Sequence, residues 1–210
     1  MKKRITSPRR LHNHANTVQA ILDTARAIMR EEGVAALSMQ ELARRMDMRA
    51  PSLYNYFSGK REIYDTLFRL GFNLFREHLN DQLKDATNLQ DELRLNFEAY
   101  MSFAIANPEL YQLCFERPVP GFVPSKASLE TSFGLLQQVY QRAEQFKGAL
   151  DTDLSAQQIV DTVIAMTHGL TALHLSNEPN LPVGQGRFGS LIPAVMTILE
   201  KAWLTKGETK

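Results

Sequence analysis

The sequence predicts an all-α protein of about nine helices in two domains. Apolar residues recur every three or four positions along most of the chain, and no stretch alternates as a half-buried strand does. The charge is also divided: residues 1–69 hold 13 Lys and Arg against 7 Asp and Glu, a net charge of +6, whereas the rest of the chain carries −5. A basic head on an acidic body is typical of a domain that binds a polyanion, with chance segregation of charge as the alternative.

The first helix is expected to begin at Asn16 or Thr17 and to end at Gly33, which suits the position just after a helix. Its apolar residues follow helical spacing: Val18, Ile21, Leu22, Ala25, Ile28 and Met29. Residues 1–12 are basic and lack that period. We expect an arm that is disordered by itself and that either lies along DNA or is a solvated tail.

Two short helices are expected next. Ser38 can cap the first of them, and Glu41 three residues later completes the pattern of a capping box. Asp47 favours a turn, and Pro51 is tolerated in the first turn of a second helix, which is expected to end at Phe57. Two short helices joined tightly are the skeleton of a helix-turn-helix, whose second helix enters the DNA major groove.

Leu53 and Phe57 are four residues apart, so both should face the interior of this unit. The remaining side chains of the second helix and its flanks would then face outward. Together with the capping serine, the candidate DNA-binding residues are Ser38, Arg49, Ala50, Pro51, Ser52, Tyr54, Asn55, Tyr56 and Lys60. The alternative is that the two tyrosines only pack within an ordinary helical hairpin.

This stretch resembles the DNA-binding domain of the TetR family of tetracycline-repressor-like regulators. The resemblance rests on the capping Ser38, the run Leu53-Tyr54-Asn55-Tyr56-Phe57 and Lys60, and it covers roughly residues 14–70. It implies that Ser38, Tyr56 and Lys60 hold phosphates and that Tyr54 contacts a phosphate or a base. Family members commonly have Gly where this chain has Pro51, so the reading helix is expected to meet its bases differently.

The domains are predicted at residues 1–59, which comprise the basic arm and the helix-turn-helix, and 60–210, which would bind a ligand and dimerise. Pro-rich and Gly-rich loops at residues 117–124 and 177–189 separate the later elements, and Gly71 marks close packing or a hinge. The expected helices of this second domain run over 60–86, 88–106, 108–115, 125–147, 155–176 and 188–204.

Many aromatic residues of the second domain could surround a ligand cavity, although packing in a helical core is the alternative for each of them. The candidate ligand-binding residues are Phe72, Phe75, Phe97, Tyr100, Met101, Tyr111, Cys114, Phe115, Phe133, Leu136, Tyr140, His168 and Thr171. Few charges accompany them, which favours an apolar or aromatic effector.

The stretch Thr167-His168-Gly169 resembles the Trp-His-Gly motif of one subgroup of TetR C-terminal domains, with Thr167 in place of the tryptophan. His168 is either a ligand contact or a hydrogen-bonded core residue. The family resemblance also implies a homodimer through the last two helices. Both helices carry apolar stripes, formed by Val160, Val163, Ile164, Thr167 and Thr171 and by Leu191, Val195, Ile198, Leu199 and Ala202.

Several classes of protein are excluded by what the sequence lacks. It has no apolar run long enough for a membrane span and no secretory signal, so we expect a cytoplasmic protein that is nucleoid-associated when bound to DNA. Cys114 is the single cysteine, and no spacing suggests a metal site, a cofactor or a catalytic grouping. An enzyme is therefore not expected.

The leading hypothesis is a homodimeric transcriptional regulator, most often a repressor in this family, released from a palindromic operator by a small molecule. The alternatives are a DNA-binding architectural protein that senses no metabolite, and a helical ligand carrier or enzyme.

Overall fold

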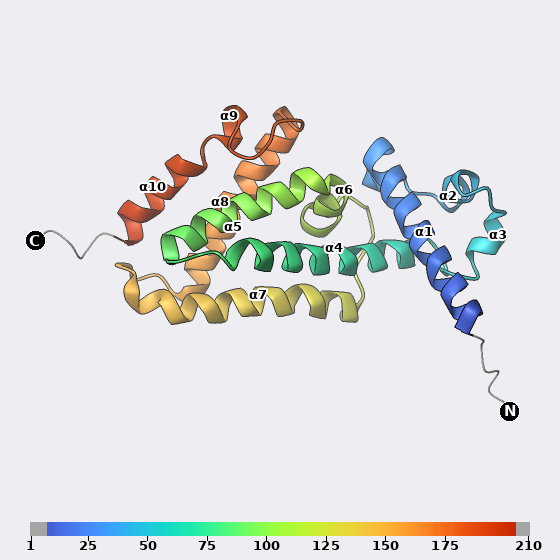
Figure 1. The fold of residues 1–210 in the computed structure, drawn as a ribbon, viewed down its shortest axis with the longest axis horizontal. Coiled ribbons are helices and arrows are strands. Elements are labelled where there is room, and N and C mark those ends of the chain that lie inside the picture. The colour runs from blue at the N-terminus through green and yellow to red at the C-terminus, as the bar shows by residue number, and fades with distance from the viewer. Residues whose placement is uncertain (1–7, 205–210) are drawn as a thin grey trace, which may run out of the picture. The chain divides into compact units, whose positions relative to one another are not determined.

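The computed structural model describes residues 8–204, and within that range every regular element is helical (Figure 1). The predicted all-α class is confirmed. The chain divides into two compact units, one formed by Met1–Leu70 and Glu109–Ser128 and the other by Gly71–Pro108 and Leu129–Lys210. Compactness thus groups residues 60–70 and 109–128 with the helix-turn-helix, and the break within the long fourth helix falls at Gly71. The division into domains at residues 1–59 and 60–210 stays a prediction, because compact units need not be domains that fold independently.

Helix α1 spans Pro8–Glu32 and begins about two turns earlier than predicted. The prediction of a start at Asn16 or Thr17 was wrong because residues 8–15 lack an apolar stripe. Polar side chains bond along the helix there instead, since Thr17 donates to the carbonyl of Asn13 at 2.9 Å and Asn16 pairs with His12. Residues 8–12 of the expected arm are therefore helical, and residues 1–7 lie outside the described part.

Helix α2, Met39–Arg45, follows a short 3₁₀ turn at Val34–Ala36. The predicted cap is confirmed, because the Ser38 hydroxyl accepts a 3.1 Å hydrogen bond from the Glu41 amide. At the other end, the amide of Met48 donates to the carbonyl of Ala43 at 2.9 Å. That bond closes a Schellman motif in which Asp47 takes the left-handed conformation, with φ of 51°. The sharp stop leaves little chain before the next helix.

Helix α3 is short, Ala50–Leu53, with Pro51 in its first turn as predicted. The prediction that it continues to Phe57 was wrong, since Tyr54–Tyr56 form a turn closed by the Tyr56 amide on the Leu53 carbonyl at 2.9 Å. Leu53 and Phe57 are nevertheless buried as predicted, 0% and 5% exposed. In Figure 1 α2 lies next to α1, and α3 lies beside α2.

Helix α4, Lys60–Leu83, and helix α5, Leu89–Ala106, match the predicted helices closely. Asn88, the first residue of the predicted range, caps α5 by accepting a 2.9 Å hydrogen bond from the Asp91 amide. Helix α6 covers only Pro108–Tyr111, and the chain then winds into a π-helix over Gln112–Glu116. The predicted helix to Phe115 is therefore correct in extent but not in type, because the wider π turn inserts an extra residue that no apolar period reveals.

Polar contacts join the segment Glu109–Ser128 to the helices of the first unit. Glu109 in α6 is fully buried and receives hydrogen bonds from Arg26 at 2.8 Å and Arg30 at 3.0 Å, both in α1. Ser128 donates to the carboxylate of Asp65 in α4 at 2.9 Å. Residues far apart in sequence thus hold this segment to α1 and α4.

The second unit is built around α5, α8 and α10. Helix α7 spans Lys126–Phe146 and runs into a 3₁₀ turn at Lys147–Ala149, whereas α8, Ala156–Asn177, starts with a complete capping box at Ser155. The predicted loop at 177–189 contains a four-residue helix α9, Gly186–Gly189, and the last helix α10 is Ile192–Trp203 rather than 188–204. The hydrophobic core of the second unit comprises Phe97, Met101, Ile159, Val163, Ile192, Met196, Leu199 and Trp203.

Candidate nucleic-acid interface

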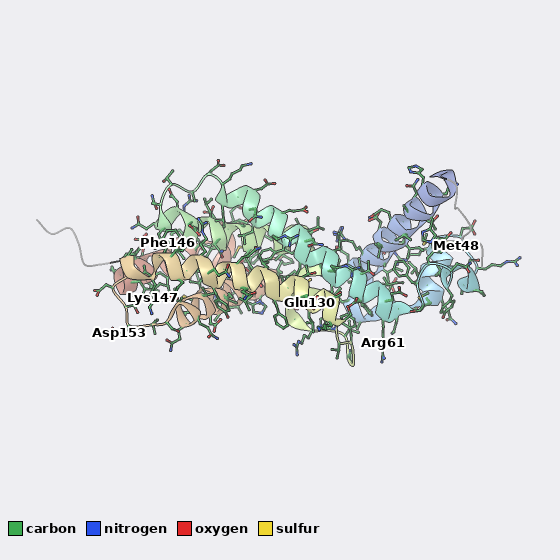
Figure 2. The ribbon with its side chains drawn as sticks, turned by 90° about the horizontal axis from the view of Figure 1, so that it is seen from below. Met48, Arg61, Glu130, Phe146, Lys147 and Asp153 are labelled. Carbon is green, nitrogen blue, oxygen red and sulfur yellow. The ribbon has the colours of Figure 1, made fainter. Side chains whose placement is uncertain are left out.

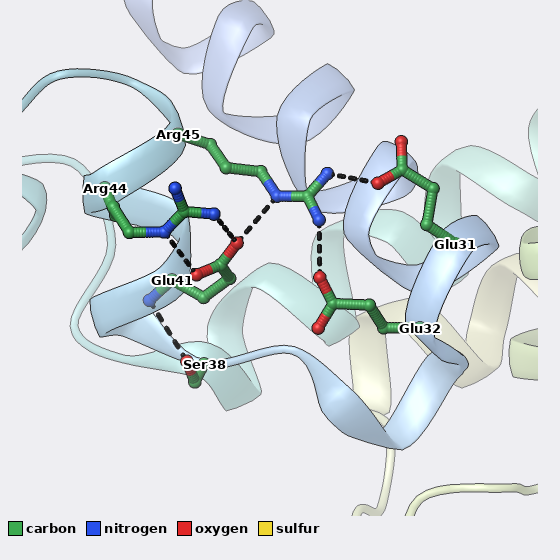
Figure 3. Close-up of polar contacts among 6 residues, drawn as sticks. All are labelled: Glu31, Glu32, Ser38, Glu41, Arg44 and Arg45. Atoms are coloured by element: carbon green, nitrogen blue, oxygen red, sulfur yellow. Dashed lines mark hydrogen bonds and ion pairs between the residues drawn. The ribbon is translucent and has the colours of Figure 1, made fainter.

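An ion-pair network fixes α2 to the end of α1 (Figure 3). Arg45 donates to Glu41 at 2.8 Å and to Glu31 at 2.5 Å, and it also pairs with Glu32. Arg44 binds the same Glu41 carboxylate through two hydrogen bonds. Hydrogen bonds from Arg44, and next from Arg45, lower the pKa of Glu41 from 4.5 to about 2. The Glu41 side chain is therefore held by arginines and does not return to the Ser38 amide, so the predicted capping box is only half formed.

The network also decides which positive charges remain available for a ligand. Arg44 and Arg45 have their charges compensated by carboxylates on α1 and α2. In contrast, Arg49, Lys60 and Arg61 are exposed, and none of them forms an ion pair with a described residue. Uncompensated cations therefore gather around α3 and the first turn of α4, where Figure 2 shows the side chain of Arg61 projecting outward.

The candidate reading residues lie on α3 and its flanks. Tyr54 is 56% exposed, a larger fraction than is usual for the ring of a tyrosine. Arg49, Pro51 and Asn55 are also exposed, whereas Ala50 and Ser52 are partly buried. The exposed ring and the amide can offer hydrogen bonds to phosphates and base edges, which is what a reading helix requires.

Tyr56 is held differently from Tyr54. Its side chain is only partly exposed, and its ring lies 5.0 Å from the ring of His14 on α1, with an interplanar angle of 38°. His14 was missed in the sequence because it precedes the expected start of the helix. A signal was present, since His14 continues the inward stripe of Val18, Ile21, Ala25 and Ile28 at steps of four and three.

Three of the candidate ligand-binding residues come together in the second unit. Phe75 of α4 packs edge-to-face on Tyr100 of α5 with ring centroids 5.4 Å apart. The Tyr100 hydroxyl lies 3.1 Å from Nδ1 of His168 on α8, within hydrogen-bond distance. Two buried aromatic rings and the imidazole of His168 thus adjoin one another in this unit.

The other candidates are distributed over several environments. Phe97 and Met101 are buried in the core of the second unit, and the partly buried Phe72 lies one turn before Phe75 on α4. Thr171 is completely buried, and its hydroxyl has no hydrogen-bond partner among the described residues. Phe133 is 60% exposed on α7.

Leu136 and Tyr140 are partly exposed on the same helix, and the Tyr140 hydroxyl donates to Asp161 at 2.8 Å. Tyr111, Cys114 and Phe115 belong to the first unit. There the Tyr111 and Phe115 rings are 5.7 Å apart. The Cys114 thiol donates to the Phe68 carbonyl, and burial raises its pKa strongly.

Residues 8–204 contain no group of His, Cys, Asp or Glu side chains arranged to hold a metal ion. Over the same residues, no helix combines the length and the hydropathy that crossing a membrane requires.

Comparisons with known proteins place the two parts of the chain in one family. Residues 21–67 match the model of the bacterial regulatory proteins of the tetR family. Residues 93–188 match the model of the tetracyclin repressor-like C-terminal domain. The chain belongs to the TetR family. The family resemblance stated for residues 14–70 is confirmed, and the family and the relatives that match are transcriptional regulators rather than enzymes.

Two curated relatives match about half of the chain. The uncharacterized HTH-type transcriptional regulator YobS of Bacillus subtilis is 33% identical over 96 residues, which cover 46% of this chain and 50% of YobS. The HTH-type transcriptional activator FasR of Mycolicibacterium smegmatis is 28% identical over 96 residues, or 46% and 44% of the two chains. The matched residues thus span about half the length of these relatives.

A solved structure has a similar fold over most of the chain. FadR from Bacillus subtilis, crystallised in complex with stearoyl-CoA, superposes with a TM-score of 0.69 and covers 86% of this chain and 96% of its own. The sequence identity is 16%, so this likeness concerns the fold alone.

Proposed function

We propose that this TetR-family regulator is a homodimeric repressor that binds a palindromic operator and is released from it by a small apolar or aromatic effector. The observation that carries the proposal is the contrast between Arg44 and Arg45, whose charges are compensated, and the uncompensated Arg49 and Lys60 beside the exposed Tyr54. Only the second group offers free charge to a polyanion.

The roles on DNA follow from how each residue is held. Lys60 and Tyr56 would contact phosphates, and the capping Ser38 would contribute from the start of α2. Exposed Arg49 and Tyr54 flank α3 and would reach base edges or neighbouring phosphates. Pro51 fixes the first turn of α3, so it would set the angle at which Ala50, Ser52 and Asn55 approach the groove.

The proposed dimer uses the outer faces of α8 and α10. Ile164 on α8 is 42% exposed, and Leu191, the N-cap of α10, and Ile198 within α10 are 40% and 57% exposed, which is costly for isolated protomers and favourable in a helix-to-helix seam. Other members of the expected stripes are buried within the protomer. Val160, Val163, Thr167, Thr171 and Leu199 are at most 9% exposed, so they would add little surface to the proposed interface.

The effector is proposed to be mostly apolar with one polar group, because Phe75, Tyr100 and His168 adjoin one another in that order. The related fold of FadR with bound stearoyl-CoA supports a long-chain acyl compound as the first probe. Effector binding would act by favouring a conformation in which the two reading helices of the dimer no longer match the spacing of about 34–36 Å between major grooves.

A direct test compares a palindromic duplex with a single half-site of the same sequence, selected by the protein from a random pool. A cytoplasmic homodimeric repressor should bind the palindrome at least about tenfold more tightly, because two linked half-sites act as one ligand. It should also lower expression from a reporter that carries this operator. Equal affinity for both duplexes would exclude the dimeric mode, and activation of the reporter would reverse the proposed sign, as the activator FasR illustrates for this family.

The architectural alternative predicts a different result in the same assay. A protein that senses no metabolite would bind duplexes tightly, yet no acyl-CoA or aromatic compound would weaken the complex. Binding that persists unchanged across a panel of such compounds would therefore favour that alternative.

A further inference from the structure

The contact between His14 and Tyr56 joins two segments that the sequence separates by a complete helix-turn-helix. His14 lies in the two turns of α1 that precede the expected start of the helix. Its ring centroid is 5.0 Å from that of Tyr56, within the range in which aromatic rings attract each other. No other ring contact among the described residues reaches Tyr56.

Tyr56 needs such a contact because little else fixes it. It lies three residues after Leu53, the last residue of α3, in a turn where its amide donates to the Leu53 carbonyl at 2.9 Å. None of the hydrogen bonds among the described residues uses its hydroxyl. A side chain in that situation samples several rotamers, and DNA binding would have to select one of them at an entropic cost.

His14 itself is positioned firmly enough to restrict those rotamers. It stands seven residues before Ile21, which is 0% exposed, and so continues the face of α1 that packs on α2. Helix α1 is continuous on both sides of His14. In the turn that contains His14, the Thr17 hydroxyl also donates a hydrogen bond to the Asn13 carbonyl. A ring on a rigid helix can therefore form a wall against which the Tyr56 ring rests.

We infer that His14 is a positioning residue that preorganises Tyr56 for its contact with a DNA phosphate. This inference rests on the proposed phosphate role of Tyr56. By this inference, α1 contributes to DNA binding through the contact of His14 with Tyr56. This contribution is separate from any effect of the basic charge of the N-terminal residues.

The test measures duplex affinity and melting temperature for a set of variants in the full-length protein. His14→Ala should weaken binding to specific and random duplexes by about two- to tenfold, the range expected for loss of an aromatic pair. Its melting temperature should not fall, since His14 is exposed and Ala is the better helix former. His14→Phe keeps a ring at the same place and should restore affinity to within about twofold of the parent.

Two further variants separate positioning from other effects. His12→Ala is the matched control, because His12 is also an exposed histidine of α1 but bonds to Asn16 on its own helix. It should leave affinity unchanged. In the Tyr56→Phe background the hydroxyl is already absent, so adding His14→Ala should cost little more, which a double-mutant cycle would show as strong coupling.

The outcomes distinguish the inference from the function on which it rests. If Tyr56→Phe leaves affinity unaltered, the phosphate role of Tyr56 is wrong. If Tyr56→Phe weakens binding but His14→Ala does not, only the positioning role is overturned. It is equally overturned if His14→Phe binds as weakly as His14→Ala, if the two losses simply add, or if His12→Ala is as damaging.

Discussion

The Nε atom of Arg26 in α1 donates a 2.8 Å hydrogen bond to Oε1 of Glu109 in α6, and the side chain of Glu109 has no exposed surface. Arg30, one turn further along α1, completes the arrangement with a second guanidinium group on the same carboxylate. A fully buried carboxylate is tolerated only when its charge is compensated, so α6 and α1 depend on each other for stability.

Removing the charge of Glu109 should therefore destabilise the protein. Glu109→Gln keeps the size of the side chain but removes the negative charge that Arg26 and Arg30 share, and we expect a loss of about 1–3 kcal/mol in the free energy of unfolding. Arg30→Ala should cost about 1 kcal/mol or less, because half of the Arg30 side chain is already exposed. Urea denaturation followed by circular dichroism measures both, and equal losses would contradict this ranking.

The charged residues of the proposed DNA surface should differ in what they contribute. Lys60→Ala should weaken binding to specific and random duplexes alike and flatten the salt dependence of affinity by about one counter-ion per protomer. Arg49→Ala should instead change base preference by about 1–3 kcal/mol at one position of each half-site. Lys84→Ala, at the other end of α4 and paired with Asp81, is the control that should leave both properties intact.

The dimer interface can be tested with adjacent residues of α10. Ile198 is 57% exposed, so Ile198→Glu should leave the protomer folded but give monomers in sedimentation, with loss of operator affinity. Leu199 is 2% exposed in the core, so Leu199→Glu should unfold the protein instead. Thr197→Glu introduces the same charge at an exposed polar position and should remain dimeric. A normal dimer for Ile198→Glu would move the interface elsewhere.

Acid should weaken the link between α1 and α2. The pKa of Glu41 is about 2 in the folded protein against an ordinary value of 4.5, so its ionised form stabilises the fold. That contribution is complete above pH 4.5 and is lost as the pH falls from there toward 2. The melting temperature of Glu41→Gln should lie below that of the parent at pH 6, and the difference should shrink below pH 4.5. A difference that does not depend on pH would exclude this origin.

The proposed effector should stabilise the folded protein and lower its affinity for the operator. A ligand present at about 100 times its dissociation constant contributes about 2.7 kcal/mol, which appears as a rise in melting temperature. The same ligand must weaken operator binding by the reciprocal factor. His168→Ala or Phe75→Ala should reduce the thermal shift, while ligand-free operator binding stays within a few-fold of the parent. If both variants fail to fold, these residues belong to the core instead.

Local signals in the sequence were reliable where a single side chain satisfies the backbone beside it. Ser38, Asn88 and Ser155 each begin a helix at the predicted residue, because each side chain accepts a hydrogen bond from an amide three residues later. Burial of Leu53 and Phe57 followed from their spacing alone. The family motif around Tyr56 could be recognised for the same reason, since all its parts lie within a few residues of one another.

Features that depend on distant residues could not be predicted. Glu109 is separated from Arg26 by 83 residues, and no spacing rule connects them. The carboxylate of Glu41 was expected to cap α2 but pairs with arginines, because charged donors hold a carboxylate more strongly than a backbone amide does. Which members of the apolar stripes on α8 and α10 face the protomer core also depends on packing against α5.

The segment 109–128 belongs by its contacts to the unit that carries the helix-turn-helix, although the chain reaches it only after α5. A chimaera that joins residues 1–70 to the body of another regulator would leave Arg26, Arg30 and Asp65 without Glu109, Ser125 and Ser128. Transplanting the DNA specificity of this protein to a new sensor would therefore require two pieces of sequence. The segment 109–128 would have to be transferred together with residues 1–70. Recombination at a single point would therefore separate two segments that form one compact unit.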